Sequence, residues 1–409
     1  MGKIEGISIR NYGVLKDIRM GKLYSFREGK PLGNMVTIIG PNGAGKSTVA
    51  DAFGFVADCL DAGVEEACDM RNRGGFKQLI SQSADNEISF ELYYRETSNS
   101  RPITYELTIS IDKSSRPYVK HERLRQRQEK NRSGRPLSFL NIDDGKGYAY
   151  EGRLGGEDDA GYTISERDKV NVSLSDKRKL GIATYGAMSQ YDRIVDFMKF
   201  LKSWYLCYFS PDSARQMQFA SPQPVLDRTG SNINNVAQYM EREDPKKFRQ
   251  ILDEIQSKIP GIKKISPKRL ENDQMVLEFH ENGFGKPFYS GRMSDGTLKL
   301  FAYYLLLNEK KTRNLVFIEE PENGLYHQFL ADLASEMKKS VGTGFSKQLF
   351  ITTHSPFFIN ALLPEDVWVL EKGEDGFSTL KRADEYEYVQ SMANEEILLG
   401  DLWFSKYFG

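Results

Sequence analysis

Lys46 follows a glycine-rich turn, and it is the first residue in this 409-residue chain whose type and spacing predict a chemical role. Residues 36–48 read VTIIGPNGAGKST and fit the pattern G-x-x-x-x-G-K-[ST]. Glycines in such a turn let backbone N–H groups approach a phosphate, and the following helix directs its positive end at the same anion. Lys46 would reach the β- and γ-phosphates of ATP, and the Ser47 hydroxyl would complete a Mg²⁺ shell. The residues expected to surround the phosphates are Gly40, Pro41, Asn42, Gly43, Ala44, Gly45, Lys46, Ser47 and Thr48.

Two adjacent carboxylates stand at the end of a second strand of the buried type. The segment NLVFIEEPENGLYH contains the apolar run Leu315–Ile318, and Glu319 and Glu320 follow it directly. Open parallel sheets bind their ligands at the carboxyl ends of their strands. We therefore expect Glu319 to lie at the Mg²⁺ ion and Glu320 to orient or deprotonate the water that attacks a phosphate. The usual first acid at the end of such a strand is aspartate. Glu319 is one methylene longer, so both a direct and an indirect contact with the metal remain alternatives.

Two further segments place polar groups at the ends of predicted elements. In GRMSDGTLKLFAYYLLL, Ser294 or Asp295 would cap a helix and leave its N-terminus, next to Gly296, free for an anion. In QLFITTHSPFFINAL (348–362), an apolar strand ends just before His354. If this strand is the neighbour of the one that ends in the two carboxylates, His354 comes within reach of the γ-phosphate.

The rest of the sequence predicts the strands and helices that position these groups. Alternating apolar and polar residues predict strands at 4–20, 86–96 and 103–112, the last two as a hairpin. The segment SQYDRIVDFMKFLKSWYLCYF has the spacing of a helix. We divide the chain into an N-terminal lobe at 1–112, a basic and acidic insertion or arm at 113–178, a helical arm subdomain at 179–260, and a C-terminal lobe at 261–409.

The overall composition excludes several classes of protein. The formal net charge is -1, which excludes a uniformly basic nucleic-acid binder. A local basic strip remains, because nine Lys or Arg stand against two Glu between Lys113 and Pro136. No apolar run approaches the roughly 18 residues of a membrane span, and the N-terminus lacks the apolar core of a signal peptide. Three dispersed cysteines indicate a reducing compartment, so we expect a cytoplasmic protein with no membrane partner.

In order and spacing, the four motifs resemble the ABC-type ATPase heads of the SMC, RecF and OLD families. The signature motif of those families is usually LSGGQ, and MSDGT takes its place here. The closest resemblance is to small bacterial ATPases with an SDGT signature, several of which are ATPase subunits of OLD-like anti-phage systems. The resemblance covers roughly 1–112 and 262–362. It implies an α/β fold, the ABC-type P-loop NTPase head, with a mixed central sheet flanked by helices, an N-terminal antiparallel β part and an inserted helical arm.

The resemblance also implies roles for individual residues. The catalytic set would be Lys46, Glu320 and the switch histidine His354, with Mg²⁺ held by Ser47 and Glu319. The signature Ser294, Asp295 and Gly296 would contact ATP bound to a second copy of the chain, and Asn323, Gly324 and Leu325 would form the D-loop between the copies. The Q-loop glutamine would be Gln78 or Gln82. We therefore expect a homodimer, or a higher even-numbered oligomer, that holds ATP between its heads.

Two functions follow from the resemblance. In the first, the ATPase works in anti-phage defence with a separately encoded effector, a nuclease or toxin. In the second, it is a RecF- or SMC-like DNA-binding ATPase of repair or recombination, and the strip after Lys113 follows the DNA phosphates. Full-length OLD-type enzymes add a Toprim nuclease with a D-x-D pair, and residues 355–409 contain no such pair. We therefore expect no nuclease activity in this chain.

Overall fold

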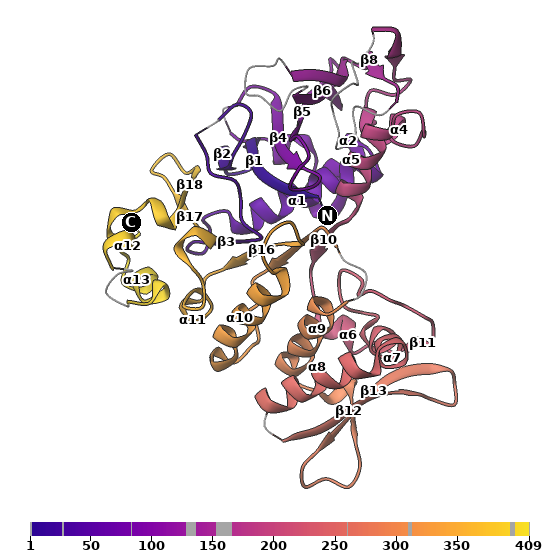
Figure 1. Cartoon of the computed structure of the whole chain (residues 1–409), viewed down its shortest axis with the longest axis vertical. Coiled ribbons are helices and arrows are strands. Elements are labelled where there is room, and N and C mark those ends of the chain that lie inside the picture. The colour runs from indigo at the N-terminus through magenta and orange to yellow at the C-terminus, as the bar shows by residue number, and fades with distance from the viewer. Residues whose placement is uncertain are drawn as a thin grey trace.

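A six-stranded sheet forms the middle of the molecule, shown as a computed structural model in Figure 1. The structure describes residues 2–26, 28–82, 84–127, 136–152, 166–259, 261–309, 313–392 and 397–408. The central sheet has the order β10-β15-β16-β3-β17-β18, with the first five strands parallel and β18 antiparallel to β17. Its strands are β3 (Met35–Ile39), β10 (Trp204–Cys207), β15 (Leu315–Glu319), β16 (Gln348–Thr353), β17 (Val367–Lys372) and β18 (Ser378–Arg382).

Both faces of the central sheet are buried, which explains the continuous apolar runs in its strands. Successive side chains of a strand point to opposite faces. Val36 and Ile38 of β3 therefore join one hydrophobic core, whereas Met35 and Ile39 join the other. The first core contains helix α1 (Lys46–Asp61), and Phe53 of α1 packs on aromatic rings of β15 and β16. The second core contains α9 (Asp295–Leu307), α10 (Leu330–Val341) and α11 (Pro356–Ile359).

An eight-stranded antiparallel sheet packs on the other side of α1 (Figure 1). Its order is β2-β1-β4-β5-β6-β7-β8-β9. The buried amide of Gln348 on β16 joins the two sheets, since it accepts from Ile4 N at 2.7 Å and donates to Ile4 O at 2.8 Å. The strands are β1 (Lys3–Tyr12), β2 (Leu15–Gly21), β4 (Glu87–Arg95), β5 (Ile103–Ile111), β6 (Pro117–Arg127), β7 (Pro136–Asp143), β8 (Lys146–Tyr150) and β9 (Lys169–Ser173).

The remaining elements form a second lobe and connect the sheets. A small sheet of β11 (Gln218–Phe219), β12 (Ile262–Arg269), β13 (Gln274–Glu281) and β14 (Phe288–Tyr289) packs against α7 (Ile233–Glu243) and α8 (Pro245–Lys258). This lobe also holds α9, as Figure 1 shows. The short helices are α2 (Val64–Asp69), α3 (Phe76–Leu79), α4 (Gly181–Tyr185), α5 (Asp192–Lys202), α6 (Pro211–Ala214), α12 (Glu387–Met392) and α13 (Leu399–Phe404). Within the described ranges, no helix is both long and apolar enough to cross a membrane.

The structure agrees with the predicted architecture and corrects two segments. The hairpin at 86–112 is confirmed as β4 and β5. The segment around Trp204 was predicted to be helical, but α5 ends at Lys202 and β10 begins at Trp204 as a parallel partner of β15. All four residues of β10 are buried, and a short apolar run of this kind fits a helix or a strand equally well in sequence.

The described part of 113–178 extends the eight-stranded sheet as β6–β9 and does not form a separate arm. Its basic residues alternate with buried ones such as Val119 and Leu124, as in a β-strand. The many charged residues make this alternation hard to recognise in the sequence. The expected cations Lys130, Arg132 and Arg135 lie outside the described residues.

A buried carboxylate in β6 joins this sheet to α4. Glu122 is fully buried and accepts from the Tyr105 hydroxyl at 3.0 Å and from Ile182 N at 3.1 Å, at the start of α4. Burial raises the pKa of Glu122 to about 7, although these hydrogen bonds act to lower it. The protonated form is therefore favoured in the folded chain relative to the unfolded chain.

We predict that Glu122 makes the fold less stable as the pH rises from about 4.5 to about 7. The folded pKa lies above the unfolded value, so the folded state binds more protons in this window and the free energy of unfolding falls by up to about 3 kcal/mol. Glu122→Gln should flatten the slope, as measured by urea unfolding at several pH values. The exposed control Glu66→Gln should keep it, and an unchanged slope in Glu122→Gln would contradict the prediction.

Candidate nucleotide-binding site

The glycine-rich loop encloses the Lys46 ammonium. The loop runs from the end of β3 to the first residue of α1, and Gly43 (φ 82°) and Gly45 (φ 104°) adopt left-handed backbone angles that glycine accepts without strain. Lys46 Nζ donates to Gly40 O at 2.9 Å and to Pro41 O at 3.3 Å, and its side chain is 4% exposed. The loop therefore has the strand–turn–helix context that the motif requires, with the lysine held inside it.

Two other turns hold this loop from outside. Ser378 Oγ, at the start of β18, donates to Ala44 O at 2.6 Å, and Ser378 N donates to Val14 O at 2.9 Å. A Cβ on Gly45 would lie 2.8 Å from Ser378 Oγ and from a methyl group of Val14. The turn between β1 and β2 and the hairpin of β17 and β18 thus fix the loop through close contacts that allow only glycine at position 45.

The two adjacent carboxylates face the lysine from the end of β15. Glu320 Oε1 lies 3.7 Å from Lys46 Nζ, and Glu320 Oε2 accepts from Asn323 Nδ2 at 2.9 Å. Glu320 has a φ of 41°, an uncommon angle for a residue with a side chain. Its N–H donates to Thr352 O on β16 at 2.9 Å, which holds the strained residue in place.

The pKa values of these carboxylates shift in opposite directions. Burial raises the pKa of Glu319, although a hydrogen bond with Ser47 opposes the shift. Burial acts on Glu320 in the same sense, but the hydrogen bond from Asn323 and the charges of Lys46 and His354 hold the pKa of Glu320 below its usual range. These contacts favour the ionised form of Glu320, which is the form that orients or activates a water.

Ser47 and Glu319, the two predicted Mg²⁺ ligands, have side chains of a type that a magnesium ion prefers. A hydrogen bond with Ser47 is one of the influences on the pKa of Glu319, so one hydroxyl and one carboxylate lie close together. Mg²⁺ prefers oxygen ligands, keeps several waters and binds through few protein groups together with substrate phosphates. Among the described residues, no group of three or more His, Cys, Asp or Glu side chains could hold a metal ion. The chain would therefore supply two ligands, and phosphates and water the others.

His354 lies beside Glu320, as its predicted strand pairing requires. Strand β16 lies between β15 and β3 and is parallel to both. His354 Nδ1 is 3.5 Å from Glu320 Oε1 and 3.1 Å from Glu322 Oε1. The histidine side chain remains 42% exposed, so it is accessible to a bound phosphate.

The signature segment packs against the D-loop of the same chain. Ser294 caps α9 by accepting from Thr297 N at 3.2 Å, as predicted. A Cβ on Gly296 would lie 2.8 Å from Gly324 O, so only glycine allows this approach. Lys299 Nζ donates to Asn323 O at 2.6 Å, and the side-chain amide of Asn323 binds Glu320. Helix α9 is thus joined to the carboxylates through the turn at 323–325, the predicted D-loop.

The two candidate Q-loop glutamines stay alternatives. Gln78 on α3 and Gln82 after it are both exposed. Their segment is held against the end of β1, because Gly13 N donates to Leu79 O at 2.6 Å. In the described part of the chain, neither side chain hydrogen-bonds to the residues of the glycine-rich loop or to the carboxylates.

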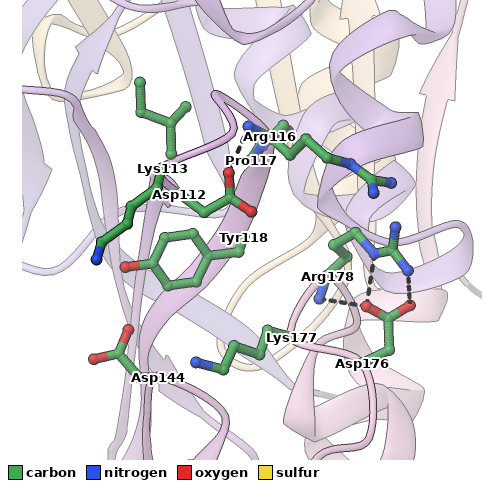
Figure 2. A pocket seen from close by; sticks show the side chains of 10 residues that line it. Asp112, Lys113, Arg116, Pro117, Tyr118, Asp144, Asp176, Lys177 and Arg178 are labelled. Carbon is green, nitrogen blue, oxygen red and sulfur yellow. Dashed lines mark hydrogen bonds and ion pairs between the residues drawn. The ribbon is translucent and has the colours of Figure 1, made fainter.

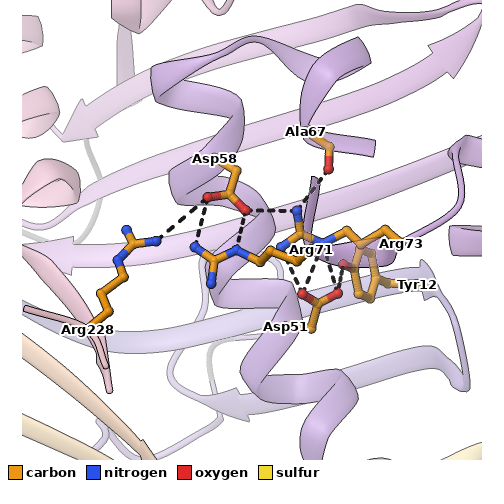
Figure 3. A network of polar contacts seen from close by, with 7 residues as sticks. All are labelled: Tyr12, Asp51, Asp58, Ala67, Arg71, Arg73 and Arg228. Atoms are coloured by element: carbon orange, nitrogen blue, oxygen red, sulfur yellow. Dashed lines mark hydrogen bonds and ion pairs between the residues drawn. The ribbon is translucent and has the colours of Figure 1, made fainter. Parts of the chain in front are cut away.

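A network of arginines and aspartates next to this site was not foreseen from the sequence. In Figure 3, Asp51 and Asp58 of α1 face Arg71 and Arg73 from the segment between α2 and α3. Asp58 accepts from Arg71 Nε at 2.7 Å and from Arg73 Nη1 at 2.8 Å, and the Asp58 and Arg73 side chains are both almost fully buried. Hydrogen bonds and charges from both arginines hold the pKa of Asp58 below its usual range, against its burial. Arg228 of the second lobe lies 3.9 Å from Asp58.

Glu322, Lys299 and Ser378 were also missed, and only the first had a signal. Glu322 is the third acid of the EEPE segment, two residues after Glu320. Lys299 and Ser378 belong to elements whose packing against the D-loop and the glycine-rich loop is visible only in three dimensions.

The basic strip is interleaved with acids in its described part. Arg116 pairs with Glu65, Lys120 with Glu87, and Arg125 with Glu106. Figure 2 shows the adjoining pocket of about 480 Å³, where Arg178 pairs with Asp176. Its lining residues, of mixed charge, are Ile111, Asp112, Lys113, Arg116, Pro117, Tyr118, Asp144, Asp176, Lys177 and Arg178. The described part of the strip is therefore not a continuous positive track.

Comparisons with known proteins agree with the architecture. A family model described as "AAA domain, putative AbiEii toxin, Type IV TA system" matches residues 35–147 and 193–360. The structure of an Smc head bound to the C-winged helix domain of ScpA is 14% identical, covers 93% of this chain and 99% of that chain, and has a TM-score of 0.52. An Smc head with an extended coiled coil, bound to the C-terminal domain of ScpA derived from Pyrococcus furiosus, is 13% identical over 96% of this chain and 100% of that chain, with a TM-score of 0.50. No curated protein matches the chain. At these identities the structural likeness concerns the fold, which is that of an SMC-like ABC ATPase head.

We predict that Lys46→Ala abolishes ATP binding, because it removes the cation that the loop holds at the phosphate position. Fluorescent-nucleotide titration should show no saturable binding. The exposed Lys339→Ala on α10 should bind ATP as the unaltered chain does. Unchanged affinity in Lys46→Ala would contradict the assignment of the phosphate site.

We predict that Asp58→Ala lowers the free energy of unfolding by about 3 kcal/mol. The substitution removes one of the two carboxylates that pair with the buried Arg73. Denaturant unfolding measures this change. Asp253→Ala, at an exposed position of α8, should be nearly neutral. A loss as small as that of the control would show that the network does not stabilise the packing of the 70–73 segment on α1.

Proposed function

The chain belongs to this AAA-domain family, and we propose that it is an ATP-binding and ATP-hydrolysing ABC/OLD-like ATPase whose nucleotide-driven dimerisation regulates or scaffolds a separately encoded effector in bacterial anti-phage defence. The observation that supports ATP hydrolysis most strongly is the meeting of Lys46, Glu320 and His354 at one edge of the central sheet. Phosphoryl transfer needs positioning and charge neutralisation, which this set supplies together with Mg²⁺ at Ser47 and Glu319.

Two copies would be needed to complete each nucleotide site. Ser294–Gly296 and the D-loop Asn323–Leu325 pack together, and Asp295 and Asn323 are exposed. Among the described residues, no hydrogen bond or ion pair joins Ser294, Asp295 or Gly296 to the glycine-rich loop of the same chain. This arrangement supports a role for the signature in closing the ATP site of a second copy. ATP bound between the heads would hold the pair together, and hydrolysis would release it.

The effector role is supported by the family and by the resemblance of the motifs. The family description names a toxin and a type IV TA system. The similar Smc heads are bound to a domain of a separate protein, ScpA, which supports a head that works with another chain. The DNA-binding alternative has less support, because the described cations Arg116, Lys120 and Arg125 are already paired with carboxylates.

We predict that Glu320→Gln binds ATP but turns it over at least about 100-fold more slowly, because the amide cannot accept a proton from the attacking water. Steady-state phosphate release and size exclusion with ATP and Mg²⁺ measure the two effects, and the variant should accumulate as an ATP-bound dimer. The matched control Glu336→Gln on α10 should keep turnover and should not trap the dimer. Full turnover in Glu320→Gln would place the catalytic base elsewhere.

The partner is tested by purifying the chain together with the products of its own operon. We expect a stable complex with one effector, and ATPase activity that changes with that effector more than with DNA. A chain that purifies alone and is stimulated only by DNA would favour the repair or recombination ATPase.

A further inference from the structure

A buried carboxylate outside the assigned catalytic set lies beside the switch histidine. Glu322 follows Glu320 by two residues, and its side chain is 6% exposed. Its Oε1 accepts from Thr353 Oγ1 at 2.8 Å and from His354 N at 2.7 Å, and it lies 3.1 Å from His354 Nδ1. One carboxylate oxygen therefore accepts from the backbone of His354 and also lies within ion-pair distance of its ring.

The second oxygen of Glu322 has a different environment. Oε2 is buried and has no hydrogen-bond partner among the described residues. The nearby counter-charge is Lys299 of α9, whose ammonium is bound to Asn323 O. Burial lowers the pKa of Lys299, and the charge of Glu322 opposes this shift. A carboxylate placed at such cost in desolvation calls for an explanation beyond the packing of the turn.

The contacts of Glu322 correspond to those of a group that orients a histidine. A carboxylate that accepts from Nδ1–H selects one ring tautomer and fixes the ring plane, which leaves Nε2 for the reacting partner. Glu320 Oε1 lies 3.5 Å from the same Nδ1, farther than Glu322 Oε1. Glu322 thus makes the shorter of the two contacts with Nδ1.

We infer that Glu322 is the positioning residue for His354, and that it holds the D-loop turn and the switch histidine as one unit. The inference rests on the proposed ATPase function. The charge of Glu322 acts on Lys299 of α9 as well as on His354, and Leu325 N donates to Glu322 O at 2.9 Å. A displacement of the signature helix or the D-loop would therefore move the histidine with it.

The test is a double-mutant cycle on ATP turnover. Glu322→Gln should lower kcat by about tenfold or more and leave the ATP affinity unchanged, because small misplacements of a positioned group have effects of this size. In the His354→Ala background, Glu322→Gln should cause no further loss, since the residue it positions is already absent. The matched control Glu309→Gln, which also alters a buried glutamate, should keep kcat.

A second readout does not depend on activity. In ¹⁵N-histidine NMR spectra, assigned with His354→Ala, His354 should show a protonated Nδ1 that is lost in Glu322→Leu, which removes both acceptor oxygens. If Glu322→Gln folds poorly, Glu322→Asp keeps the charge but shortens the reach and should give the same fall in kcat. Equal losses from Glu322→Gln with and without His354, or an unchanged Nδ1 signal, would overturn the inference. Absence of ATP turnover in the unaltered chain would instead refute the proposed ATPase.

Discussion

The parallel pairing of β15, β16 and β3 is the constraint on which the rest of the site depends. Strands that run in the same direction end at the same edge, so the carboxylates, His354 and the glycine-rich loop are brought together from segments far apart in the chain. Packing maintains this order. Phe53 of α1 lies against Phe317 of β15 and Phe350 of β16, with ring centroids 5.3 and 4.9 Å away. Burial of one such ring contributes roughly 1.5–3 kcal/mol.

The turn after β15 adds the local geometry that the sheet alone does not provide. Glu320 has an unfavourable φ, and the hydrogen bonds from its N–H to β16 and from Asn323 to its side chain hold it there. Strain of this kind persists only when the surroundings determine the conformation, and it is common at functional sites. Lys299 and Gly296 connect the same turn to α9, so the proposed nucleotide chemistry and the surface proposed to meet a second copy share one short segment.

The sequence was sufficient to predict the fold class and to single out residues that the structure brings together, because both depend on local patterns. The glycine-rich loop, the paired glutamates and the helix cap are contiguous motifs, each at the end of a strongly apolar strand or the start of a helix. The features that the sequence predicted wrongly or did not reveal depend on tertiary packing. Trp204–Cys207 becomes a strand because β15 is there to pair with it. The partnership of Glu322 with His354 joins residues 32 positions apart and appears only when two strands are known to be neighbours.

The central claim is that each ATP site takes its closing wall from a second copy of the chain, and mixing two inactive variants tests it most directly. Lys46→Ala lacks the phosphate-binding cation, and Ser294→Arg blocks the signature surface, so each variant should be inactive alone. If copies assort at random, half of the dimers combine the variants and have one intact site, so the mixture should regain about a quarter of the unaltered turnover. A mixture as inactive as its components, or full activity in Ser294→Arg alone, would contradict the claim.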